Sequence, residues 1–381
     1  MTPTTPAIER AQPRSAQIAA LDGIRGIAVG LVVWLHLRSE QMPGGWVGMS
    51  VFFPLSGFLM TRLILNERSH TGGHVGLRRF WLRRARRLLP AHYVVLAVVV
   101  ALLIVGGTSE ASDRGAVVSS LLYSNNWWQL AHSVDYWSEF SGRLSPFEHL
   151  WSLSVEEQFY VLWPIIAVVV LRYARRPLRA LGCVACGLSV VGFIYGLAIT
   201  RFGWGSTTDV YYNTGVRGAE LLAGSALAVL FVARPTMWTN QRARTALDLG
   251  SGASLAVIAI LALRLDGAAS RFIADGGMFA TGLGTVLIIA AAVRGGAVEA
   301  LLSSMPLRWL GTRCYSLYLW HWPIIALVTR ESSGFSGWWL TSVQLALMSA
   351  ATVVSYRLVE DPFRRGLRAS IATWSRDTAL V

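Results

Sequence analysis

The sequence predicts an all-α polytopic integral membrane protein, with about ten transmembrane helices in one bundle. Of its 381 residues, 54% are hydrophobic and 14% are charged, and the mean hydropathy is +0.48; soluble domains carry roughly 25% charged residues. The apolar residues form blocks close to the ~20 residues that a spanning helix needs. The formal charge of +13 could indicate nucleic-acid binding. However, the arginines concentrate between the apolar blocks, as the positive-inside rule describes.

Ten segments are long and apolar enough to be predicted spans. They are 19–38, 46–66, 88–106, 149–171, 180–199, 216–233, 246–263, 276–293, 309–329 and 338–358. An even number of spans places both termini on one side, which we expect to be the cytoplasmic side of the inner (plasma) membrane. Loops then assigned inside hold arginine clusters at 78–87, 172–179 and 234–244, whereas outer loops hold scattered single arginines. This asymmetry supports the orientation.

The rest of the chain is interpreted as tails and one irregular segment. Residues 1–18 are predicted to be a flexible cytoplasmic tail, 19–365 one transmembrane domain, and 366–381 a short cytoplasmic tail. The N-terminal stretch lacks the pattern of a signal peptide. Residues 115–148 are too short in apolar length and too polar to cross, so we expect a re-entrant or interfacial segment.

The first predicted span carries two ionisable residues, Arg25 and His36, eleven residues apart. Eleven residues make about three helical turns, so both side chains share one face, separated by roughly 16 Å. Asp22 lies one turn before Arg25 and could cap the helix or pair with it. Arg25 could simply extend to the interface, but two ionisable groups on one face favour a function.

The basic run "FWLRRARRLLP" precedes the third apolar block. Much of it, including Arg83 and Arg86, fits a routine cytoplasmic flank. Arg84 and Arg87 lie one turn apart on one helical face. Because guanidinium groups offer forked donors that suit phosphate, a polyphosphate ligand could bind at the cytoplasmic mouth.

Three further motifs place ionisable groups inside predicted spans. "HLWSLSVEEQFYVLWP" holds Glu156 and Glu157, which point about 100° apart, so at least one should be buried and paired. "YSLYLWHWP" holds His321 beside Tyr318, and "YYNTGVRGAELLAG" holds Arg217 one turn before Glu220. For Arg217 and Glu220 a structural ion pair is favoured, and for His321 a hydrogen-bonded core residue is as plausible as a functional one.

Signatures of other chemistries are missing from the sequence. It contains no G-x-S-x-G elbow, Walker loop, H-E-x-x-H or dinucleotide fingerprint. "CVAC" has redox spacing but no βαβ context or nearby metal-type histidine. We therefore expect no metal site and no nucleic-acid partner.

Seven motifs in order resemble the acyltransferase family 3 membrane proteins, the O-antigen acetylase type. Besides those quoted, they include "LDGIRGIAVGLVVWLHL", "GWVGMSVFFPLSGFLMT" and "YRLVEDPFRR", and the resemblance covers residues 19–365. It implies that an acyl group, commonly acetyl, moves from cytoplasmic acyl-CoA to a hydroxyl of a carbohydrate or other acceptor. The family's Arg-to-His spacing matches Arg25 and His36, its R-x-x-R motif matches Arg84 and Arg87 (Arg83 and Arg86 in the other register), and its glutamate matches Glu156.

The resemblance and the spacing together suggest an expected mechanism. Arg84, Arg87, Arg83 and Arg25 would hold acyl-CoA as co-substrate, with no bound cofactor. His36 would act as general base or take the acyl group briefly itself, and Glu156 would orient His36 or bind the acceptor. Supporting positions would be Asp22, Glu157, Tyr318, His321 and Arg217.

Three matters stay open at this level. Many relatives carry a C-terminal SGNH esterase-like domain, and only a short tail follows Glu360 here, so we expect a standalone form. The acceptor could be a surface polysaccharide, a lipid-linked sugar or a small natural product such as a glycosylated macrolide. The rival class is a proton-coupled transporter, which would be expected to show matching broken spans in two halves.

Overall fold

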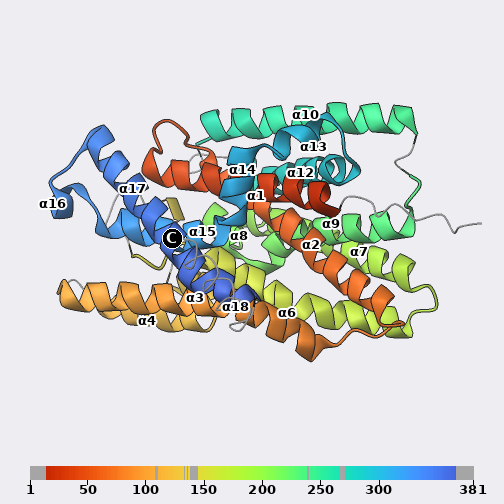
Figure 1. Cartoon of the computed structure of the whole chain (residues 1–381), viewed down its shortest axis with the longest axis horizontal. Helices are drawn as coiled ribbons and strands as arrows, with labels where there is room; N and C mark the ends of the chain where they lie inside the picture. Colours follow the sequence, from red (N-terminus) through yellow and green to blue (C-terminus); the bar gives the residue numbers. More distant parts are fainter. Residues whose placement is uncertain are drawn as a thin grey trace, which may run out of the picture.

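The computed structural model describes residues 14–107, 110–132, 134, 136–137, 145–237, 240–266 and 271–365, and their regular secondary structure is entirely helical (Figure 1). Nine of the described helices are long and apolar enough to cross a membrane. They are α1 (Arg14–Leu37), α2 (Gly48–His70), α3 (Leu77–Val105), α6 (Leu150–Tyr173), α7 (Pro177–Arg201), α9 (Thr214–Ala233), α10 (Gln241–Arg264), α12 (Gly277–Arg294) and α17 (Gly337–Ser355). The predicted fold class is confirmed.

The remaining predicted span, 309–329, is not one continuous helix. It is divided into α14 (Met305–Thr312) and α15 (Cys314–Leu327). The 14 residues of α15 cover only about 21 Å, less than a bilayer core of ~30 Å. Arg313 at the break stacks over the rings of Trp309 and Tyr356, at 4.7 and 5.0 Å. A break at membrane depth is tolerated where protein surrounds it.

The segment predicted to be re-entrant forms two short helices, α4 (Ala111–Leu121) and α5 (Asn125–Ala131). Neither is among the helices long enough to span. Asn125 is fully buried, and its backbone N–H donates a hydrogen bond to Ser154 Oγ of α6 at 3.1 Å. The segment therefore returns into the bundle beside α6. Part of its predicted continuation, including 138–144, lies outside the described residues, as do residues 1–13 and 366–381 of the predicted tails.

Shorter elements complete the bundle. They are η1 (Gly45–Val47), α8 (Thr207–Tyr212), α11 (Arg271–Ala274), α13 (Ala297–Leu302), α16 (Arg330–Ser333), the π-helix η3 (Tyr356–Glu360) and α18 (Asp361–Arg365). α1 and α2 form the middle of the bundle: α1 packs on α2, α14 and α15, and α2 on α9 and α12. The connections after α2, α6 and α9 share the right-hand end of Figure 1.

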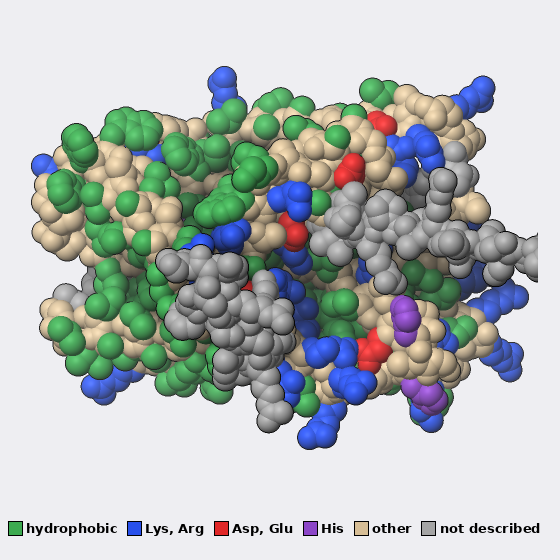
Figure 2. Space-filling view, viewed as in Figure 1, with side chains coloured by type: hydrophobic (Ala, Val, Ile, Leu, Met, Phe, Trp, Pro, Cys, Tyr) green, Lys and Arg blue, Asp and Glu red, His purple; other side chains and the backbone are tan. Residues whose placement is uncertain are grey.

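The outer surface of the long helices is apolar, as a lipid-facing surface requires. Large hydrophobic side chains are exposed on α3, α6, α7 and α10, among them Ile104, Leu162, Val191 and Ile260. Green side chains accordingly cover much of the face in Figure 2. The chain is a multi-pass membrane protein.

Candidate functional site

A cavity of about 480 Å³ opens among α1, α2, α3, α6 and α15, and we call it the central cavity. Its size falls within the ordinary range of ligand pockets. Five of the predicted site residues meet there. Those lining it are Arg25, Arg84, Arg87, Glu156 and Glu157, joined by Ser56, Arg62, Tyr123, Tyr160, Cys314 and Tyr315.

The cavity's cations are positioned by neighbouring side chains. Arg25 forms the predicted ion pair with Asp22 of its own helix, at 2.7 Å. The guanidinium of Arg84 lies 3.5 Å from the centre of the Tyr160 ring, a distance typical of cation–π contact. The Nε atoms of Arg84 and Arg87 are buried and have no hydrogen-bond partner among the described residues. These donors are available to an anionic ligand.

A second hollow of about 530 Å³, the vestibule, lies between the end of α2 and the start of α3. It shares Leu63, Asn66, Arg84 and Arg87 with the central cavity, so the two hollows adjoin. Arg79 and Arg83 line only the vestibule. Figure 2 shows arginine side chains gathered over this part of the surface. The combined space is strongly cationic where it meets solvent.

The structure distinguishes the two possible registers of the R-x-x-R motif. Arg84 and Arg87 line both hollows. Arg83 lines the vestibule and forms an ion pair with Glu67, whereas Arg86 is exposed on α3. The Arg84 and Arg87 face is the one that points into the cavity.

Glu156 is held by two hydroxyl groups in the central cavity. Its carboxylate accepts hydrogen bonds from the hydroxyls of Ser56 and Tyr160. Both donors lie on the walls of the central cavity. The carboxylate is thereby fixed within the cavity by Tyr160, one turn along its own helix, and by Ser56 of α2, which is distant in sequence.

His36 pairs with His321 across α1 and α15. His36 Nδ1 and His321 Nε2 are 3.2 Å apart, and His321 Nδ1 lies 2.6 Å from the Tyr318 carbonyl oxygen. A carbonyl can only accept, so His321 Nδ1 carries a proton; in neutral His321, Nε2 must then accept from His36 Nδ1–H. Nε2 is therefore the unprotonated nitrogen of a neutral His36, which is the atom a general base uses.

His149 is a third histidine at this place, and sequence reasoning gave it no role. Its ring centre lies 5.4 Å from that of His321 and 5.5 Å from that of Tyr318. Both its nitrogens are buried. It lies seven residues before Glu156, which is two turns along the same helical face. This spacing is the sequence feature that could have identified His149 as a site residue. We call His36, His149 and His321 the histidine cluster.

The central cavity and the histidine cluster are joined by α6 and α15. Tyr315 lines the cavity and His321 is six residues further along α15, a rise of about 9 Å. Tyr318 stands between them and bonds to Ser152 Oγ at 2.7 Å and to the His149 carbonyl at 2.6 Å. Ser152 precedes the cavity residue Leu153. The predicted supporting residues Tyr318 and His321 thus connect the two parts.

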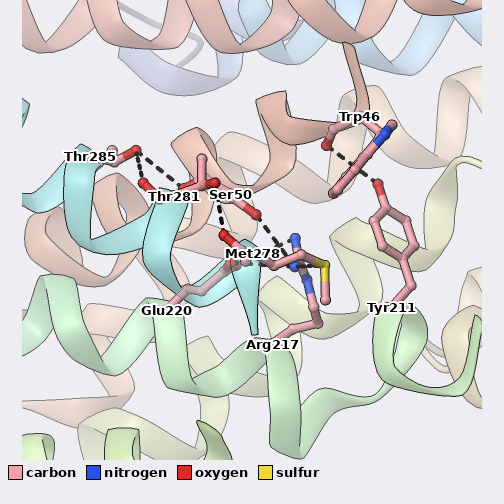
Figure 3. Close-up of polar contacts among 9 residues, drawn as sticks. Trp46, Ser50, Tyr211, Arg217, Glu220, Met278, Thr281 and Thr285 are labelled. Carbon is pink, nitrogen blue, oxygen red and sulfur yellow. Dashed lines mark hydrogen bonds and ion pairs between the residues drawn. The ribbon is translucent and has the colours of Figure 1, made fainter. Parts of the chain in front are cut away.

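Arg217 and Glu220 form a separate buried pair, shown in Figure 3. Their side chains are 1% and 2% exposed and form an ion pair at 3.3 Å. Arg217 also contacts Ser50 Oγ at 3.5 Å and Met278 Sδ at 2.8 Å. Neither residue lines the central cavity. The favoured interpretation of a structural ion pair agrees with this placement among α2, α9 and α12.

Within the described residues, no group of three or more His, Cys, Asp or Glu could hold a metal ion. Cys183 and Cys186 are free and exposed, and Cys314 is free and buried. The "CVAC" pair therefore forms no disulfide in this structure.

Comparisons with known proteins agree with this architecture. The sequence profile of the acyltransferase domain family matches residues 18–356. Peptidoglycan O-acetyltransferase OatA of Listeria monocytogenes is 33% identical over 352 residues, which cover 91% of this chain and 56% of that protein. A Bacillus subtilis protein provisionally named peptidoglycan O-acetyltransferase YrhL is 34% identical over 359 residues, covering 92% and 56%.

A further relative, from Staphylococcus aureus and provisionally named an O-acetyltransferase, is 34% identical over 363 residues, covering 92% of this chain and 58% of the relative. The chain thus spans a little over half the length of these curated relatives. No solved structure matches the chain significantly. Because the profile covers most of the sequence and the relatives exceed 30% identity, the chain belongs to the acyltransferase family 3 membrane proteins.

Proposed function

We propose that this protein is a membrane O-acetyltransferase that moves an acetyl group from cytoplasmic acyl-CoA to a hydroxyl of a carbohydrate acceptor. The observation that carries the proposal is a pair of adjoining arginine-lined hollows, with two paired histidines beginning about 9 Å beyond the cavity residue Tyr315 along α15. The family match and the names of the relatives support the class of reaction. The donor and the roles of the residues are inferred from the site.

The two adjoining hollows suit the donor. The phosphates of acyl-CoA would lie in the vestibule and at its junction with the central cavity, against Arg83, Arg84 and Arg87. Unpartnered guanidinium N–H groups favour such ligands, because charge-assisted hydrogen bonds to phosphate are strong. The pantetheine arm would then extend through the central cavity past Arg25 and Glu156, bringing the thioester toward Tyr318.

At the histidine cluster, His36 Nε2 would take the proton of the acceptor hydroxyl. The hydroxyl oxygen forms a bond to the thioester carbonyl carbon, and the carbon–sulfur bond breaks. The imidazolium then returns its proton to the CoA thiolate, so the products are an ester and free CoA. The Nδ1–H···Nε2 contact with His321 would stabilise the charge on His36 during the transfer. In the alternative order, His36 first takes the acyl group from the thioester and then passes it to the acceptor hydroxyl.

The acceptor is proposed from the relatives. OatA is named as acting on peptidoglycan, and His36 lies toward the end of α1 opposite its cytoplasmic start in the predicted orientation. An envelope glycan reached from outside suits both points. A natural-product tailoring enzyme and a proton-coupled transporter are less favoured, because the matching family is an acyltransferase and the named relatives are O-acetyltransferases.

The test of the catalytic assignment is acetyl transfer by a His36→Ala variant. We expect transfer, measured as glycan-bound acetate in a deletion strain complemented with each variant, to fall by about 10²-fold or more. Membrane levels of the protein should stay the same. Wild-type acetylation by this variant would contradict the role of His36.

Donor binding is tested separately with purified protein. An Arg84→Ala, Arg87→Ala double variant should bind CoA at least tenfold more weakly in calorimetry, because both residues line the junction of the two hollows. The matched control is Arg78→Ala with Arg86→Ala, two exposed arginines of the same helix. Equal affinities in the two double variants would remove the arginine pair from the donor site.

A further inference from the structure

Glu360 is a buried carboxylate that the proposed reaction does not use. It lies in the motif "YRLVEDPFRR", to which the proposed function gives no role. The residue is 2% exposed. An ionisable group buried in a membrane bundle is costly, so its presence there indicates a function. The surroundings of Glu360 connect it to the proposed donor site.

A π-helix sets the direction of Glu360. The α-helix α17 ends at Ser355 and continues as η3 (Tyr356–Glu360). The N–H of Asp361 donates to the carbonyl of Tyr356, five residues earlier, whereas an α-helix would bond four residues earlier. The wider turn holds one extra residue, which corresponds to about 100° of helical rotation, and such turns often occur at functional sites. A uniform α-helix would direct the Glu360 carboxylate to a different face.

The Glu360 carboxylate is fixed by α15, behind the wall of the central cavity. Ser316 Oγ donates a hydrogen bond to Glu360 Oε2 at 2.8 Å, and Ser316 is fully buried. Cys314 and Tyr315, the two residues before Ser316, line the central cavity. Glu360 itself lines neither the cavity nor the vestibule. A ligand in these hollows would therefore be influenced by the charge of Glu360 without contacting it.

The charge of Glu360 acts on Arg87. Both η3 and α18 pack on α3, the helix that carries Arg87 (Figure 1), and the opposite charges of Arg87 and Glu360 attract each other. The same guanidinium is repelled by Arg25 and Arg84. Arg25 has a carboxylate of its own in Asp22. Glu360 is therefore the counter-charge that the fold supplies to Arg87.

A phosphate of the donor and Glu360 would compete for the guanidinium of Arg87. The phosphate would approach from the hollows, and the Nε of Arg87 is buried without a hydrogen-bond partner among the described residues. Charges interact strongly inside a protein because the dielectric constant is low. A carboxylate at this place therefore weakens the attraction of Arg87 for an anion. Weaker binding assists turnover where release of the product CoA limits the rate.

We propose that Glu360 is a positioning residue of the donor site, which partly neutralises Arg87 and thereby limits the affinity of the hollows for CoA. This assignment rests on the proposed function, because it requires CoA phosphates beside Arg87. Glu360 contacts neither the donor nor the reacting atoms. Its effect reaches the ligand through Arg87.

The test is CoA affinity, measured by calorimetry on the full-length protein in nanodiscs of one phosphatidylcholine. Glu360→Gln removes the charge but keeps an oxygen that can accept from Ser316 Oγ. We expect this variant to bind CoA about fivefold more tightly than wild type. The matched control is Asp361→Asn, the next residue, whose carboxylate pairs with the 40% exposed side chain of Arg364. Solvent screens that pair, so affinity should stay within about twofold.

The route through Arg87 is tested in an Arg87→Gln background. There, Glu360→Gln should change CoA affinity by less than about twofold, because the coupled partner is gone. A gain that persists without Arg87 would contradict its part in the proposal. Equal or weaker CoA binding by the single Glu360→Gln variant would overturn the proposal, since loss of a carboxylate that only supports packing does not tighten binding.

The thermal unfolding midpoint covers the case in which Glu360→Gln is unstable. A midpoint restored in the Arg87→Gln, Glu360→Gln double variant would support charge balance between the two residues. A double variant as unstable as the single one would assign Glu360 to the packing of α17 and overturn the proposal. Failure of wild type to bind CoA would reject the proposed donor, whereas CoA binding that is the same in wild type and Glu360→Gln would reject only the role of Glu360.

Discussion

His321 sets the tautomer of His36, and a substitution can separate that role from simple packing. His321 Nε2 accepts from His36 Nδ1–H, and Tyr318 fixes His321 through its carbonyl. We expect His321→Leu to lower kcat for acyl transfer by about 10²-fold with little change in KM for acyl-CoA, because the donor hollows stay intact. His321→Gln, whose amide oxygen can accept the same hydrogen bond, should recover part of kcat.

The measurement is kcat and KM for each variant at fixed acceptor concentration. Equal losses in His321→Leu and His321→Gln would mean that the acceptor atom is unimportant. A rise in KM alone would mean that His321 contributes to donor binding and not to proton transfer.

Residue-level prediction from the sequence succeeded where a contact is local to one helix. The ion pair of Asp22 with Arg25 and the shared face of Arg84 and Arg87 follow from helical periodicity. The contact of Glu156 with Ser56 could not be read in this way, because the two residues are 100 positions apart in sequence. The pairing of His36 with His321 joins residues 285 positions apart, for the same reason.

Helix α9 depends on a buried ion pair that it carries within one turn. Glu220 and Arg217 lie 3.3 Å apart with almost no exposure, and Arg217 stacks against the rings of Phe53 and Tyr211. Glu220→Leu leaves the guanidinium buried without its counter-charge, which should cost roughly 3–5 kcal/mol of folding free energy. Replacing both residues, Arg217→Met with Glu220→Leu, should cost clearly less.

The check is the thermal unfolding midpoint of purified protein in one detergent. A double variant less stable than Glu220→Leu alone would contradict the prediction, since it would mean that the arginine stabilises the bundle without its partner. CoA affinity of the folded variants should stay near wild type, because neither residue lines the donor hollows.

The crossing of α2 and α9 depends on two glycines that let the backbones touch. A Cβ on Gly224 would lie 1.8 Å from the Pro54 carbonyl oxygen, and one on Gly57 would lie 1.7 Å from that of Leu221. Gly224→Ala must therefore separate the helices, and we expect a loss of about 1–3 kcal/mol. Gly218 of the same helix has open space around it, so Gly218→Ala should slightly raise stability.

The two alanine variants are compared by thermal unfolding in the same detergent. Equal midpoints would show that the crossing relaxes without cost. The sequence located these helices well by apolar length, but it did not predict the break at Arg313. The segment 309–329 carries Gly311, Thr312 and Arg313 where the helix breaks, and Arg313 stacks there on Tyr356 of η3.

The whole molecule is organised as a cationic entrance at one end and a histidine cluster further along α1 and α15. The fold class was accessible from the sequence because apolar length and arginine placement are properties of whole segments. The central cavity was not, since it is enclosed by helices from distant parts of the chain. Orientation across the bilayer still follows from the arginine asymmetry alone.

That orientation can be tested by cysteine labelling in intact cells. His74 is exposed in the connection after α2, assigned to the cytoplasm, and Ser336 is exposed before α17, assigned outside. A membrane-impermeant maleimide should label Ser336→Cys in intact cells and His74→Cys only after the membrane is opened. Wild type, with Cys183, Cys186 and Cys314 in apolar segments, sets the background. The reverse pattern would place the vestibule outside the cell, where acyl-CoA is absent, and would remove the basis for the proposed donor.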